Sequence, residues 1–78
     1  MAEIPKAVVA RLIRLAGADR VSSGAVGVMT EVLENVCNVI GAEAVRLSKY
    51  AGRQTVKGAD VEEAALRGIH LNVIEPAK

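Results

Sequence analysis

The side chains that could carry out chemistry in this 78-residue chain are few. Cys37 is the only cysteine and His70 the only histidine, so neither a zinc-type ligand cluster nor an internal disulfide can form. The sequence contains no nucleophile paired with a base, no carboxylate pair beside a ligand-binding motif, and no glycine-rich phosphate loop. We therefore expect a chain that is not an enzyme, needs no metal or cofactor, and works in a reducing, intracellular setting.

Lysine and arginine are the remaining groups with a clear binding chemistry, because they neutralise DNA phosphates. The net charge is only +1, but the charges are segregated along the chain. Acids dominate residues 21–45 and 58–66, whereas bases dominate residues 1–20 and 46–57. The basic residues of these last two segments are Lys6, Arg11, Arg14, Arg20, Arg46, Lys49, Arg53 and Lys57. The distribution keeps phosphate binding open despite the small net charge.

These cations must be positioned by helices, because the apolar residues recur at helical spacing and no stretch is rich in strand formers. Breaks at residues 17–21 and 52–56 divide the chain into three segments. We expect a first helix over residues 6 to about 16 and a third over residues 58 to about 67. Ser22 fits the N-cap of the second helix, and Gly52 ends it. The sequence therefore predicts an all-α protein.

The second helix, of about 28 residues, would be roughly 42 Å long. It carries one continuous apolar stripe, made of Met29, Val32, Val36, Ile40, Ala44, Leu47 and Ala51. A compact chain of this length has a radius of gyration of only about 11 to 12 Å, so two short helices cannot cover the stripe. A partner chain must therefore cover it. Gly24, Gly27 and Gly41 lie inside this helix and cost up to about 1 kcal/mol each relative to alanine, which close helix crossing could offset.

A membrane role is not expected. The most apolar stretch, residues 25–44, carries three glutamates and two asparagines that a membrane span would not readily tolerate. Basic residues also interrupt each apolar run near the N-terminus before a signal peptide could form. We therefore expect a soluble protein with no membrane partner.

Two segments, AGADRVS at residues 16–22 and AGRQTVKGADVEEAA at residues 51–65, resemble the loop regions of archaeal histones. The resemblance covers residues 3 to 67. It implies a histone-fold domain in residues 1–67, followed by a C-terminal extension in residues 68–78. It also implies a handshake homodimer, in which the long helices cross and the first loop of one chain lies beside the second loop of the other.

The function implied by this resemblance is that of an architectural protein. It would compact, wrap or bridge double-stranded DNA with little sequence specificity, and it would be cytoplasmic and associated with the chromosome in the nucleoid. The alternative is a histone-fold dimerisation module in a transcriptional or chromatin complex, with weak DNA wrapping. The modest charge keeps this alternative open.

The resemblance also implies roles for individual residues. Arg11 would approach the minor groove, Arg20 would lie beside Thr55 of the partner chain, and Arg53 would pair with Asp60. The DNA-binding set is Arg11, Arg14, Arg20, Gln54, Thr55 and Lys57. The dimer core comprises Met29, Val32, Val36, Ile40 and Leu47. The dimer–dimer seam comprises Leu47, Tyr50, Asp60 and Glu63.

The chain departs from the archaeal histone pattern at several points. Gln54 replaces a common lysine, and Glu63 replaces an apolar residue, so that facing carboxylates would oppose end-to-end assembly of dimers. The tail contributes Ile69, Leu71, Val73 and Ile74, which could cover the dimer core, mask the seam or create a different tetramer. A heterodimer with a paralogue also remains open. Cys37 is expected to be a buried small apolar residue.

Overall fold

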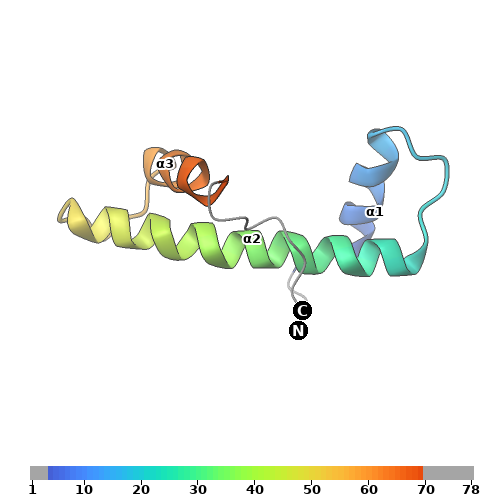
Figure 1. Cartoon of the computed structure of the whole chain (residues 1–78), viewed down its shortest axis with the longest axis horizontal. Helices are drawn as coiled ribbons and strands as arrows, with labels where there is room; N and C mark the ends of the chain where they lie inside the picture. Colours follow the sequence, from blue (N-terminus) through green and yellow to red (C-terminus); the bar gives the residue numbers. More distant parts are fainter. Residues whose placement is uncertain (1–3, 70–78) are drawn as a thin grey trace.

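The computed structural model describes residues 4–69, with side chains up to residue 67, and within this range it contains three helices and no strand. They are α1 (Lys6–Leu15), α2 (Ser23–Tyr50) and α3 (Gly58–Ile69). The two short helices pack on the same side of α2, one near each of its ends (Figure 1). The all-α prediction is confirmed. α3 continues two residues beyond the expected end at residue 67.

The first break follows from two local features. Gly17 has a φ of 123°, a conformation that glycine adopts without strain, and its N–H donates to the carbonyl of Arg14 at 2.9 Å. Ser22 then caps α2, because its Oγ accepts a hydrogen bond from the backbone N–H of Ala25 at 3.0 Å. The predicted N-cap is confirmed, and α2 begins at the next residue.

The second break is a Schellman motif. Gly52 has a φ of 76° and donates its N–H to the carbonyl of Lys49 at 2.9 Å, while Arg53 donates to the carbonyl of Ser48 at 2.9 Å. These two bonds satisfy carbonyls that the end of the helix would otherwise leave without a partner. The glycine thus ends α2 at the predicted place and turns the chain towards α3.

Little apolar surface is buried within the single chain. Among the described residues, the buried apolar side chains are Val9, Val26, Ala44 and Ala64. The residues predicted to form a dimer core are not among them: Met29 is 39% exposed, and Val32, Val36, Ile40 and Leu47 are half-buried. The radius of gyration, 14.6 Å, is larger than the 11 to 12 Å or so expected for a compact chain of this length.

Two open apolar grooves lie along α2. One, of about 250 Å³, runs between α1 and α2 and is lined by Val9, Leu12, Ile13, Ala16, Met29 and Leu33. The other, of about 290 Å³, lies at the middle of α2 and is lined by Leu33, Val36, Cys37, Ile40, Gly41 and Val61. The expectation that Cys37 is buried is wrong for the single chain, where it is exposed, because this second groove is open.

The helix-interior glycines have no explanation within the chain. A Cβ atom built at Gly27 or Gly41 would meet nothing within 4 Å, and one at Gly24 would meet only the Ser22 hydroxyl at 3.9 Å. The close helix crossing considered for them is therefore not made by α1 or α3.

α2 is strongly apolar, yet little of it is buried in the single chain. By length and composition alone this helix could cross a membrane, with a mean hydropathy of 1.2 over an 18-residue window, of which 11% is buried in the chain. The core helix of a water-soluble assembly meets the same criteria. Within the described residues, α1 and α3 therefore leave most of the apolar surface of α2 uncovered.

Candidate nucleic-acid interface

The α2–α3 loop is held in shape by Arg53. Its Nη1 and Nη2 donate to Oδ2 and Oδ1 of Asp60, both at 2.8 Å, and Nη1 also donates to the carbonyl of Thr55 at 3.0 Å. Such a bidentate pair fixes both distance and orientation. Asp60 is only 6% exposed. The loop between these two residues therefore has a defined conformation before any ligand binds.

Asp60 also caps α3. Its Oδ2 accepts a hydrogen bond from the backbone N–H of Lys57 at 2.8 Å. This is the bond of a capping box in which the side chain at N3 reaches back to the N-cap residue. The Arg53 guanidinium, together with this backbone N–H, lowers the pKa of Asp60 from 3.8 to about 2, although burial opposes the change. The same hydrogen bond raises the pKa of Arg53. The pair therefore stays fully ionised at neutral pH.

The loop presents its other side chains to solvent. Gln54, Thr55 and Lys57 are exposed, and Lys57 directly precedes the first turn of α3. The backbone N–H groups of such a turn, together with a neighbouring ammonium, favour an anion. This loop can therefore bind a phosphate through one charged side chain and through main-chain donors.

A second basic surface lies at the other end of α2. Arg11 and Arg14 are exposed on α1, with Arg14 in its last turn, and Arg20 is exposed in the α1–α2 loop. These three guanidinium groups can contact phosphates or enter a minor groove.

Ion pairing separates the arginines into two groups. Arg46 forms an ion pair with Glu43, and Arg53 forms one with Asp60. Arg67 forms ion pairs with both Glu43 and Glu63. In the described part of the chain, no ion pair involves the four cations of the predicted DNA-binding set, which are Arg11, Arg14, Arg20 and Lys57. These four are therefore available to neutralise phosphates.

The single chain does not bring the two basic surfaces together. The α1–α2 loop and the α2–α3 loop lie at opposite ends of α2 (Figure 1), a helix of 28 residues that is about 42 Å long. Arg20 and Thr55, which the sequence analysis places side by side, are therefore separated within one chain. Only a second chain running in the opposite direction could place them together.

The predicted seam residues lie around the C-terminal end of α2. Tyr50 is 89% exposed, Leu47 is half-buried and Glu63 is exposed on α3. Asp60 differs from them, because it is buried and both of its carboxylate oxygens already accept hydrogen bonds within the chain.

One feature of this region was missed by the sequence analysis. Glu43 Oε2 lies 2.6 Å from Arg46 Nη2 and 2.8 Å from Arg67 Nη1, and Arg67 Nε lies 3.2 Å from Glu63 Oε2. Arg46, helped by Arg67, lowers the pKa of Glu43 from 4.5 to about 2. Two of these pairs have helical spacing and could have been read from the sequence, but the contact between Glu43 and Arg67 could not. Glu63 is therefore a paired carboxylate.

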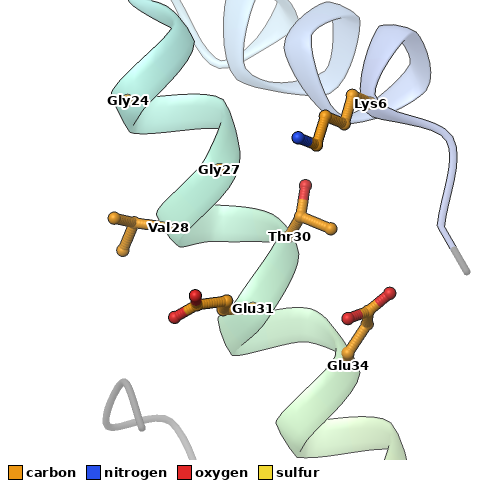
Figure 2. Close-up of a pocket in the computed structure, with 7 residues that line it drawn as sticks. All are labelled: Lys6, Gly24, Gly27, Val28, Thr30, Glu31 and Glu34. Atoms are coloured by element: carbon orange, nitrogen blue, oxygen red, sulfur yellow. The ribbon is translucent and has the colours of Figure 1, made fainter. Parts of the chain in front are cut away.

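A polar pocket of about 440 Å³ lies between α1 and the start of α2. Thr30 and Glu34 lie on the side of α2 that faces Lys6 (Figure 2). Glu34 accepts the backbone N–H of Ile4 at 3.3 Å, and Thr30 donates to the carbonyl of Val26 at 2.7 Å. Two carboxylates beside one ammonium make this pocket unsuited to phosphate, and no cluster of potential metal ligands occurs in the described residues.

Comparison with known proteins supplies the context for this geometry. Residues 2–65 match the family described as histone-like transcription factor (CBF/NF-Y) and archaeal histone. The chain is 47% identical over 64 residues to one subunit of the archaeal histone HAN1 from Thermococcus zilligii, covering 82% of this chain and 96% of that protein. It is also 47% identical over 68 residues to probable archaeal histone 3 of Methanocaldococcus jannaschii, covering 87% of this chain and all of that protein.

Proposed function

The chain belongs to the family of histone-like transcription factors and archaeal histones, and from this premise we propose that it is an architectural protein that compacts, wraps or bridges duplex DNA. One observation of the structure supports the proposal: among the described residues, four exposed cations near the two ends of α2 form no ion pair, while Arg46, Arg53 and Arg67 pair with acids within the chain. The chain is not an enzyme, because its family consists of structural and regulatory DNA-binding proteins.

The unit that binds DNA is proposed to be a handshake homodimer. The support is the uncovered stripe of Met29, Val32, Val36, Ile40 and Leu47, together with the two open grooves beside it. A second copy of α2, crossing the first between α1 and α3, would cover this stripe. It would also bring the α1–α2 loop of one chain beside the α2–α3 loop of the other.

In this dimer, Arg20 would lie beside Thr55 of the partner, and both would face the DNA backbone. Arg14 and Lys57 would contact phosphates, Gln54 would add an uncharged polar contact, and Arg11 would reach the minor groove. Contacts of this kind read few bases and favour smooth bending of the duplex. Binding would therefore depend strongly on salt and weakly on sequence.

Association of dimers is proposed to use the seam of Leu47, Tyr50, Asp60 and Glu63. Glu63 brings an acid to this surface, and Arg67 offsets its charge only in part, because Arg67 is shared with Glu43. We therefore expect weaker end-to-end stacking than an apolar seam would give. The histone-fold domain is assigned to residues 1–67, and the extension of residues 68–78 lies almost wholly outside the described part of the chain.

The partner in the cell is either a second copy or a paralogue. One relative is named as a subunit of an archaeal histone, which makes a heterodimer a specific alternative. The role as a module of a transcriptional complex is not favoured, because both of these relatives are named as archaeal histones. A chromosome-associated, cytoplasmic location in the nucleoid follows from the proposed function.

A gel-shift series on unrelated duplexes at increasing salt tests the function directly. Similar affinities at a fixed salt concentration and a steep loss of binding as salt rises are expected. Strong preference for one duplex, or an affinity that salt does not change, would contradict the proposal. The mass of the protein in the absence of DNA tests the dimer separately.

A further inference from the structure

A second stripe runs along α2, on the side that faces away from α1 and α3. Its members follow one another at alternating spacings of three and four residues, which places them on one helix face. They are Val28, Glu31, Asn35, Val39, Ala42, Arg46 and Lys49, and we call this set the outer stripe. Figure 2 shows Val28 and Glu31 pointing away from Lys6, while Thr30 lies on the Lys6 side. Val28 and Glu31 also line the polar pocket beside α1, but no member of the outer stripe lines either of the two apolar grooves.

The outer stripe is mostly exposed and partly apolar. Val28 is 52% exposed and Val39 is 38% exposed, whereas the buried residues of α2 lie on the opposite side. The handshake dimer would cover the side that carries Val36 and Ile40, so it would leave the outer stripe in solvent. Its apolar members, Val28, Val39 and Ala42, would therefore stay exposed in the dimer.

The charges of the outer stripe are arranged symmetrically about its centre. Glu31 and Arg46 lie at equal distances, about 11 Å along the helix, on either side of the midpoint between Asn38 and Val39. An antiparallel copy of the same face, crossing at this midpoint, would therefore place each Glu31 beside the other copy's Arg46. Arg46 already uses Nε and Nη2 for Glu43, and its side chain is still 58% exposed. A face that is complementary to itself is what a two-fold interface requires.

We propose that the outer stripe is a second self-association surface, through which two dimers bind back to back with their α2 helices antiparallel. The inference goes beyond the proposed function, from which it takes only the dimer as the starting unit. Val39 lies close to the two-fold axis and supplies the apolar centre of the interface. Glu31 and Arg46 flank it and set the antiparallel direction.

The test is sedimentation of the full chain without DNA over a wide range of concentrations. The mass of the wild-type protein is expected to rise from two to four times the chain mass of 8.2 kDa. Val39→Lys places two like charges at the axis and should weaken the rise about tenfold or more, with the dimer intact. Val8→Lys is the matched control, because Val8 is a valine of 39% exposure on α1 and should not affect the rise.

A mixing experiment tests the predicted pairing between chains. Glu31→Arg alone and Arg46→Glu alone should each weaken the association of dimers about tenfold, because like charges then face one another. An equal mixture of the two variants should restore the rise, since opposite charges again meet across the interface. Circular dichroism checks that each variant keeps its helices.

Three results would overturn the inference. They are a wild-type mass that stays at two chains at all concentrations, a Val39→Lys variant that associates like wild type, and a mixture that does not recover. Failure of the proposed function would look different. A protein that remains a monomer, or that does not bind duplex DNA in the gel-shift series, would contradict that function and not the outer stripe.

Discussion

The number of phosphates that the protein neutralises can be predicted from the four cations of the DNA-binding set, which form no ion pair in the described part of the chain. Arg11, Arg14, Arg20 and Lys57 would contribute eight contacts in a dimer. Each contact lowers the slope of log affinity against log salt by about 0.9, so the slope should be about −7. Between about 50 and 200 mM salt the affinity should then fall roughly 10⁴-fold. Replacing Arg20 by alanine removes two contacts per dimer and should flatten the slope to about −5.

The control for this prediction is Arg46→Ala. It removes the same charge from each chain, but from a side chain that Glu43 already neutralises at 2.6 Å. If phosphate contacts set the slope, Arg46→Ala should leave it near the wild-type value, while Arg20→Ala should flatten it. Fluorescence anisotropy titrations on one random duplex at several salt concentrations supply both slopes. Equal slopes for the two variants would show that net charge governs binding, and the assignment of the DNA-binding residues would be wrong.

Three further predictions follow from the core, the loop and the seam. Val36→Asp should convert the DNA-free dimer into an unfolded chain, because an unpaired charge in the dimer core costs several kcal/mol. Light scattering with circular dichroism measures this, and a stable folded dimer would contradict the prediction. Asp60→Asn should lower the unfolding temperature at neutral pH. It should also remove part of the acid sensitivity between about pH 4 and 2. Because the pKa of Asp60 is lowered in the folded state, its ionised carboxylate stabilises the fold above the ordinary pKa of 3.8, and this stabilisation is lost as the pH falls towards 2. A variant that unfolds with acid like the wild type would contradict the role of the pair. Glu63→Leu, or truncation after Arg67, should lengthen the complexes formed on DNA, and nuclease footprints that match wild type for both variants would refute the seam.

The helices were predictable because their ends depend on local chemistry. Gly17, Ser22 and Gly52 act through hydrogen bonds to residues no more than five positions away, so the sequence contains the information. The pair of Arg53 and Asp60 was expected from the resemblance of residues 51–65 to a loop region of archaeal histones. The contact between Glu43 and Arg67 joins residues 24 positions apart and depends on how α3 packs, which no spacing reveals. The prediction that Cys37 is buried is not met within the single chain, where the groove beside it is open.

The same reasoning explains why the net charge of this chain is a poor guide to its binding. Three of its arginines, Arg46, Arg53 and Arg67, form ion pairs with Glu43, Asp60 and Glu63 within the fold, so these charges cancel in the sum. The pKa values of Asp60 and Glu43, both about 2, show that this cancellation persists far below neutral pH. The unpaired bases lie at the two ends of α2, and an antiparallel partner would place the two sets side by side. A chain with a net charge of +1 can therefore present a basic edge to DNA while its acids stabilise the helices that shape that edge.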